Sequence, residues 1–175
     1  CMLSIITIPN KILKAETALV TPETIASADF GMFANELSPT MRAARGVGLA
    51  APQVNAGISV CVISKDAAPN MLKEDLVLIN PVWIKLSKKE VIDAEGCLSI
   101  PNVYGDVSRY KKIYVDALDI MGKPLSFDAT DFFARVIQHE VDHLHGVLFV
   151  EKATNMYRVL SEDESEPVRL QDLSI

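Results

Sequence analysis

The residues best suited to chemistry are His139 and His143, which stand four positions apart with Glu140 directly after the first. Residues with this spacing on an α-helix are rotated by about 40° from each other, so both imidazoles can reach one metal ion. Glu140 then lies beside the metal without needing to bind it. Two ordinary surface histidines on a helix are the alternative interpretation, but a chance match of all three residues is rare, which favours a metal site.

A catalytic metal bound in this way normally has three protein ligands and one open position for water. His145 is a poor third ligand, because a helical side chain two residues beyond His143 points roughly 200° away from it. A metzincin protease site is excluded, because Phe149 occupies the place of its third histidine. A gluzincin protease would take a later glutamate, and Glu162 or Glu164 keeps that alternative open.

Cys97 is the better candidate for the third ligand. It lies in the segment Glu95-Gly96-Cys97-Leu98-Ser99, where the glycine permits close backbone approach and metal binding would deprotonate the thiol. A lone cysteine is more often a small buried apolar residue, which is our interpretation of Cys61 in a predicted strand. The motif around Cys97 favours the metal instead. A thiolate and two neutral imidazoles would leave one positive charge on a divalent ion.

The two histidines require a helix, and the sequence predicts one over about 130–145, ended by Gly146. One face of this helix carries four residues at offsets of four, seven and eleven: Phe132, Val136, His139 and His143. An earlier helix of about 20 residues is predicted to begin at Thr21-Pro22. Pro39 should kink or break it, because proline removes a backbone donor.

Apolar, β-branched stretches separated by turn residues predict strands, several of them antiparallel, over 58–63, 76–84, 90–94 and 107–118. No periodicity organises the segment 154–175, which we expect to be a variable, irregular tail. With 175 residues, of which 49% are hydrophobic, the chain is long enough to bury one sizeable core. A single domain over residues 1–175 is therefore expected.

Composition excludes several classes of protein. The net charge is −6 and the basic residues are scattered, which gives little support to nucleic-acid binding. No apolar run approaches the roughly 20 residues needed to cross a bilayer, and the first residues resemble neither a signal peptide nor an Arg-rich leader. A cytoplasmic protein without membrane contact is expected. Cys1 is set aside because it precedes Met2, which resembles a natural initiator, and Cys61 and Cys97 are too few for a disulfide scaffold.

Three segments together resemble the signature motifs of peptide deformylases, in the order of that family. They are Gly46-Val47-Gly48-Leu49-Ala50-Ala51-Pro52-Gln53, Glu95-Gly96-Cys97-Leu98-Ser99 and Gln138-His139-Glu140-Val141-Asp142-His143-Leu144. The similarity extends from Ile8-Pro9 to Phe149, which is most of the chain. The resemblance implies an α+β fold in which antiparallel β-sheets pack around a long metal-binding helix.

The resemblance also implies a role for each motif. The metal ligands would be Cys97, His139 and His143. The ion would be divalent, typically Fe²⁺, although such a mixed sulfur and nitrogen site also accepts Zn²⁺, Ni²⁺ or Co²⁺. Glu140 would be the general base. Gln53 and the backbone N–H of Leu98 would bind the substrate's formyl oxygen, because amide hydrolysis needs donors aimed at the developing oxyanion.

The implied reaction removes the N-formyl group from the N-terminal methionine of nascent proteins and releases formate. The partners would be N-formylmethionyl peptides, met in transient proximity to the ribosome without direct nucleic-acid binding. The residues expected to line the substrate site are Val47, Gly48, Glu95, Gly96, Phe132 and Val136. The apolar members of this set have plain core packing as an alternative role. Arg109 is expected to be either a buried partner of Asp142 or Glu95, or a solvated arginine on a strand.

Two other functions compete with a deformylase. A gluzincin-type peptidase would take its third ligand from the acidic tail. A non-catalytic, metal-stabilised binding module would close its site with four protein ligands. The binding module is the least expected of the three, because a purely structural metal site has no need for Glu140.

Overall fold

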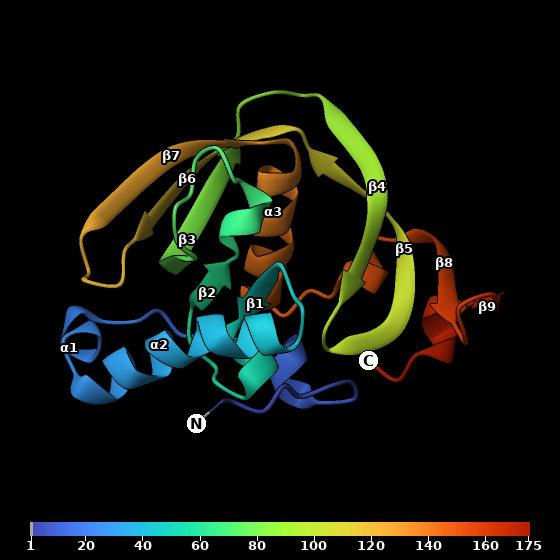
Figure 1. Ribbon diagram of the computed structural model, residues 1–175, viewed down its shortest axis with the longest axis horizontal. Helices are drawn as coiled ribbons and strands as arrows, with labels where there is room; N and C mark the ends of the chain where they lie inside the picture. Colours follow the sequence, from blue (N-terminus) through green and yellow to red (C-terminus); the bar gives the residue numbers. More distant parts are fainter. Residues whose placement is uncertain (1) are drawn as a thin grey trace.

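The computed structural model describes residues 2–175, so Cys1 lies outside the described residues. Helix α3 (Asp131–Leu144) runs through the middle of the molecule, between two antiparallel sheets (Figure 1). This is the predicted α+β fold, with the helix that carries both histidines at its centre.

The larger sheet has the strand order β1-β2-β3-β6-β7, with every neighbouring pair antiparallel. Its members are β1 (Gly48–Ala50), β2 (Val60–Ile63), β3 (Leu76–Lys85), β6 (Lys112–Leu118) and β7 (Pro124–Thr130). The apolar face of α3, including Ile137 and Val141, packs on this sheet against Ile63 and Val115. Removal of these apolar side chains from water holds the histidine-bearing helix in place.

The smaller sheet brings the cysteine motif to the helix. Its strands lie in the order β4 (Glu90–Cys97), β5 (Ile100–Tyr110), β8 (Thr154–Val159) and β9 (Ser165–Pro167). A tight turn at residues 98–99 joins β4 to β5. Cys97 therefore stands at the end of a strand, directly before a reversal of the chain.

The first predicted helix is interrupted, but at Ser27 and not at Pro39. It forms α1 (Pro22–Ile25) and α2 (Ala28–Ala43), and Pro39 lies inside α2. Ser27 Oγ donates a hydrogen bond to the Thr24 carbonyl at 2.7 Å and accepts one from the Phe30 N–H at 3.3 Å. The serine therefore ends one helix and caps the next, because its side chain competes with continued helical bonding. Among residues 2–175, no helix is long and apolar enough to cross a membrane.

The end of α2 leads the chain into the glycine-rich motif. The Gly46 N–H donates to the Met41 carbonyl at 2.9 Å, and Arg45 has a φ of +58°. This backbone pattern is common where a helix stops, and it is usually built on glycine. The apolar face of α2, which includes Leu37 and Met41, packs against Leu49 and Val60 and so joins the motif to the larger sheet.

The stretch 107–118, predicted as one strand, is divided between the two sheets. β5 ends at Tyr110 in the smaller sheet and β6 begins at Lys112 in the larger one. Buried side chains alternate with the same phase on both sides of Lys111, at Val107 and later at Val115. The alternation of buried and exposed residues indicates which side chains are buried but not which sheet buries them. The passage from one sheet to the other at Lys111 is therefore not visible in the sequence pattern.

The segment 154–175 was expected to be irregular, and this expectation was wrong for its first half. β8 adds to the edge of β5, and β9 adds to β8. Most side chains in both strands are exposed or half-buried. An outer strand is held largely by backbone hydrogen bonds, so it needs no clean apolar alternation in its sequence.

Candidate metal centre

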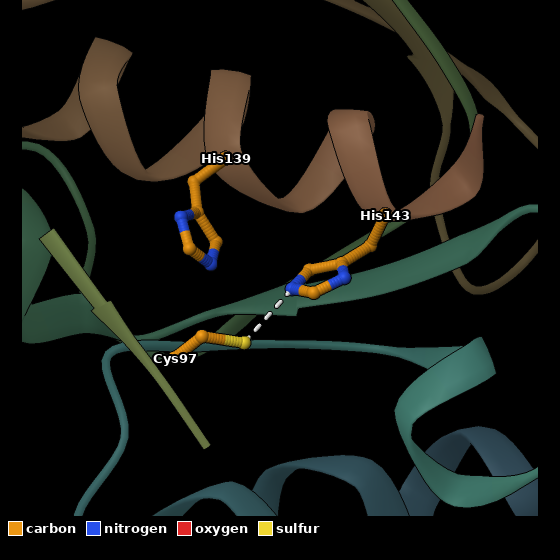
Figure 2. A group of neighbouring side chains, drawn as sticks. All are labelled: Cys97, His139 and His143. Carbon is orange, nitrogen blue, oxygen red and sulfur yellow. Dashed lines mark hydrogen bonds between the residues drawn. The ribbon is translucent and has the colours of Figure 1, made fainter. Parts of the chain in front are cut away.

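His139 and His143 project from neighbouring turns of α3 toward Cys97 at the end of β4 (Figure 2). One ligand atom from each side chain lies within 4.8 Å of the other two. Cys97 Sγ is 3.3 Å from His143 Nε2. Donors bound at 2.0–2.3 Å to a tetrahedral ion lie about 3.3–3.8 Å apart. The three side chains therefore have the chemistry and nearly the spacing of a three-ligand metal site.

The competing third ligands do not join this group. His145 is exposed, and its Nδ1 lies 2.6 Å from Glu16 Oε1. Glu162 and Glu164 are exposed residues between β8 and β9. Within residues 2–175, the triad of Cys97 and the two α3 histidines is the group of this kind that lies close enough to hold an ion. The gluzincin alternative thus lacks its glutamate.

Glu95 lies behind His139 and is only 6% exposed. Its two oxygens accept hydrogen bonds from Arg109 at 2.8 and 2.9 Å, and from Arg135 at 2.8 Å. His139 Nδ1 is 2.9 Å from Glu95 Oε2. Burial alone would raise the pKa of Glu95, but the bonds from Arg109 and His139 outweigh it and hold this pKa well below its usual range. The ionised carboxylate orients His139 so that Nε2 faces Cys97.

Arg109 is a buried ion-pair partner and not a solvated arginine. It is 5% exposed and bridges two carboxylates, with Nη1 at 2.6 Å from Asp142 Oδ2 in addition to its bonds with Glu95. Lys152 Nζ also lies 2.8 Å from Asp142. Burial tends to lower the pKa of Arg109, but Glu95 and Asp142 raise it above its ordinary value. The predicted alternatives, Glu95 or Asp142, are both partners.

Arg135 belongs to the same charged cluster and was missed by the sequence reasoning. It is 6% exposed and also donates hydrogen bonds to the carbonyls of Val107 at 2.9 Å and Val91 at 2.6 Å. One signal in the sequence could have revealed it. Arg135 stands four residues before His139, so on a helix it lies on the same face, in an otherwise apolar stretch.

Glu140 is buried in a very different environment. It is 4% exposed, and its Oε2 meets no hydrogen-bonding group among the described residues. Burial is the main cause that raises the pKa of Glu140 to about 7. The backbone of Gly48 passes so close that a Cβ on this glycine would lie 2.3 Å from Glu140 Oε1. A carboxylate with this pKa can exchange protons near neutral pH, as a general base must.

Gln53 directs the N–H donors of its side-chain amide toward Cys97 and Ser99. It lies in the short helix η2 (Ala51–Val54) and is 2% exposed. Its Oε1 accepts from the Ala50 N–H at 2.9 Å, which fixes the orientation of the amide. The Nε2 then lies 3.2 Å from Ser99 Oγ and 3.5 Å from Cys97 Sγ. Ser99, which the sequence reasoning did not assign a role, helps hold this amide.

A cavity of about 390 Å³ opens beside these side chains. Its lining includes every residue that was expected to meet the substrate, namely Val47, Gly48, Glu95, Gly96, Phe132 and Val136. Phe132 and Val47 are 48% and 42% exposed, so they are not plain core. Leu98, in the turn after Cys97, also lines the cavity. A cavity of this size, in which apolar side chains stand beside convergent polar groups such as Gln53, His139 and Glu140, is typical of a small-ligand site.

Comparison with known proteins identifies the family of this chain. The polypeptide deformylase family model matches residues 2–159. A peptide deformylase from Symbiobacterium thermophilum is 41% identical over 165 residues, covering 94% of this chain and 72% of that protein. One from Desulfotalea psychrophila is 36% identical and covers 91% and 92%, respectively. The Met-Ala-Ser-bound crystal structure of the class I type b peptide deformylase from Acinetobacter baumannii has a TM-score of 0.79 at 34% identity, covering 86% of this chain and 99% of that one. This chain therefore belongs to the peptide deformylase family.

Proposed function

We propose that Glu140, Gln53 and the Cys97-His139-His143 group together remove the N-formyl group from the N-terminal methionine of nascent peptides and release formate. The family carries the reaction itself, since deformylases are metallo-hydrolases that act on such peptides. One observation carries the assignment of residues. The buried Glu140 carboxylate, whose Oε2 has no hydrogen-bond partner among the described residues, lines the same cavity as a thiol and an imidazole that can share an ion with His143.

The donor set fits a divalent metal. A thiolate and two imidazoles suit Fe²⁺, Zn²⁺, Ni²⁺ and Co²⁺, and they leave a coordination position for water or substrate. When bound there, the ion would lower the pKa of a water molecule and polarise the formyl carbonyl. We propose Fe²⁺ as the native metal, because the deformylase resemblance implies it.

Glu140 and Gln53 have separate tasks in the proposed reaction. Glu140 takes a proton from water as the water oxygen bonds to the formyl carbon. The Gln53 amide and the Leu98 N–H donate hydrogen bonds to the carbonyl oxygen as it becomes negative. The C–N bond then breaks, formate leaves with the added oxygen, and the proton held by Glu140 passes to the amine of methionine.

The cavity supports the choice of methionine. Val47, Leu98, Phe132 and Val136 supply apolar surface beside the reacting groups. Little space is left beside Gly48 and Gly96, because a Cβ on Gly48 would collide with Glu140 and a Cβ on Gly96 would collide with the Tyr104 ring. A one-carbon formyl group fits such a constriction better than an acetyl group, whose additional methyl would disturb the attack geometry.

The deciding experiment compares three matched peptides on metal-loaded protein: formyl-Met-Ala-Ser, acetyl-Met-Ala-Ser and unblocked Met-Ala-Ser. Formate release from the first peptide is expected. Removal of the acetyl group from the second should be slower by a factor of about 100 or more. No free amino acid should appear from any of them. Release of free amino acids without formate would overturn the proposal in favour of a peptidase.

The ligand set is tested by the variant Cys97→Ala. It should lose tight metal binding, because a site with two imidazoles alone lacks the thiolate. Metal content after dialysis is the measurement, and Cys61→Ala is the control, since Cys61 is a buried cysteine outside the ligand group. Full metal occupancy in Cys97→Ala would refute the assignment.

The metal is tested by air exposure. Protein loaded with Fe²⁺ without oxygen should lose activity in air, whereas Ni²⁺-loaded protein should last, because ferrous iron and a neighbouring thiolate are both oxidisable. Equal lifetimes would argue against iron as the working metal.

We further propose that the protein acts in the cytoplasm, in transient proximity to ribosomes, where formylated chains emerge. Co-sedimentation with translating ribosomes at low salt checks this proximity.

A further inference from the structure

We infer that Arg45 selects formyl-methionyl peptides that carry a carboxylate side chain shortly after the methionine. The inference rests on the proposed function and adds a preference among its substrates. Arg45 lines the cavity beside the metal group, and its side chain is exposed. Within residues 2–175 it forms no ion pair, although the chain as a whole has a net charge of −6.

The other charged or titratable residues that line the cavity either form buried ion pairs or belong to the reacting centre. Glu95 and Arg135 are buried and paired with each other. Glu140 and His139 belong to the reacting centre. The rim contributed by β5 consists of Pro101, Asn102 and Tyr104, which carry no charge. Arg45 is thus the solvent-facing charge at the mouth, among the lining residues that the structure describes.

The backbone at Arg45 gives an independent reason to expect a function. Its φ of +58° is left-handed, at the position after a helix where glycine is favoured. Two hydrogen bonds hold it there, from the Arg45 N–H to the Arg42 carbonyl at 3.0 Å and from the Gly46 N–H to the Met41 carbonyl at 2.9 Å. A bulky side chain kept in such a conformation is strained, and strain of this kind gathers at functional sites.

The reach of Arg45 defines which substrate residues it can meet. Three peptide units separate Arg45 from Gly48, where an added Cβ would collide with Glu140, so the two Cα atoms are at most about 11 Å apart. An extended peptide advances about 3.3–3.6 Å per residue. Arg45 therefore lies within the length of a few substrate residues from the reacting groups, and the second to fourth residues of the substrate are the positions to test. A carboxylate is the group that it binds best there.

The test uses formyl-Met peptides with Asp, Asn or Lys at position two, three or four. All are C-terminal amides, so the side chain is the sole source of a carboxylate. On metal-loaded protein, kcat/KM for formate release should be roughly two- to fivefold higher for Asp than for Asn at one of these positions, and lower for Lys. The ratio should approach one at about 0.5 M salt, because exposed charges are screened.

Variants separate this role from a structural one. Arg45→Gly relieves the left-handed conformation, so its Tm should stay equal or rise while the Asp-to-Lys ratio falls to about one. Arg45→Glu should invert the ratio, and Arg45→Lys should keep part of it. Lys88→Gly, at an exposed lysine outside the cavity, should keep the wild-type ratio.

The inference would be overturned if the wild-type protein had an Asp-to-Lys ratio of kcat/KM near one at all three positions. It would also be overturned if the wild-type ratio persisted in Arg45→Gly. Both outcomes leave formate release intact. Absence of formate from every peptide would instead count against the proposed function, and the inference would fall with it.

Discussion

Glu95 and Glu140 are two nearly inaccessible carboxylates close to His139, and their surroundings are opposite in kind. Glu95 accepts hydrogen bonds from two arginines and lies against the His139 ring nitrogen. Glu140 has one oxygen without a partner among the described residues. The pKa of Glu95 is accordingly held low, whereas burial raises that of Glu140 to about 7. The same residue type is a fixed negative charge in one place and, in the proposed function, a proton carrier in the other.

The largest effect should come from Glu140→Gln. The variant removes the proposed proton carrier but keeps the shape of the side chain, so kcat should fall about 10²–10⁴-fold. Metal content should be unchanged, and the free energy of unfolding should be equal or higher, because a poorly solvated carboxylate has been neutralised. Formate-release kinetics, metal analysis and denaturant unfolding measure the three quantities. Loss of the metal would mean that Glu140 is a metal ligand. The proposed difference between Glu95 as a fixed charge and Glu140 as a proton carrier would then be wrong.

Glu95→Gln, in contrast to Glu140→Gln, should lower both the stability of the fold and the affinity for the metal. Arg109 and Arg135 would lose their shared charge partner, and the free energy of unfolding should fall by about 3–5 kcal/mol. Metal affinity should fall about 10–100-fold, because His139 loses the group that orients it. Glu90→Gln, at an exposed residue on the same strand, should change stability by less than about 0.5 kcal/mol. If Glu95→Gln proved as stable as Glu90→Gln, the fixed-charge role would be wrong.

Gly48→Ala tests how tightly Glu140, the proposed proton carrier, is confined. The new Cβ would lie 2.3 Å from Glu140 Oε1, so the carboxylate must move. A displacement of about 1 Å should lower kcat about 100-fold while the metal is retained. The matched control is Gly31→Ala, because a Cβ on Gly31 meets no heavy atom within 4 Å. Equal activity in the two variants would show that Glu140 tolerates displacement.

Asp75 repeats the chemistry of Glu95 near the surface and should give the smallest effect. It accepts hydrogen bonds from Arg42 Nε at 2.8 Å, the Lys65 N–H at 2.9 Å and the Ser38 hydroxyl. Burial alone would raise its pKa, but these bonds outweigh it and hold the pKa below the ordinary value. Asp75→Asn should lower the free energy of unfolding by about 1 kcal/mol at neutral pH.

The pH dependence follows from the direction of that shift. A carboxyl with a lowered folded-state pKa stabilises the fold above its unfolded pKa of about 3.9, and this contribution is lost as the pH falls through the folded value. The stability difference between wild type and Asp75→Asn should therefore shrink as the pH falls below about 4. A difference that grew on acidification would contradict the ion pair.

The grouping of Cys97 with the two histidines, which the structure brings together, was predictable from sequence because its signal is local. His139 and His143 follow the repeat of one helix, and Cys97 lies in a short motif of its own. Arg109 and Arg135 are harder to assign, because their partner Glu95 is distant in the chain and only the fold brings the three together. Charge pairing across two elements leaves no periodic pattern.

The errors in the predicted fold have similar causes. Proline was expected to break the first helix, yet the hydroxyl of Ser27 does so, through bonds to Thr24 and Phe30 that compete with the helix. The change of sheet at Lys111 occurs without a change in the phase of burial. Strands β8 and β9 depend on a partner edge that exists only after β5 has formed.

Strand β9 also bears on how the molecule meets copies of itself. β5 is 11 residues long, and its free edge would be a ready template for strands of other molecules if β8 did not cover it. The edge on that side of the sheet belongs to β9, which spans three residues, carries Glu166 and ends in Pro167, a residue without an N–H to donate. A short, charged, proline-ended edge resists further strand addition. The sheet that carries Cys97 is thereby protected from aggregation at its outer side.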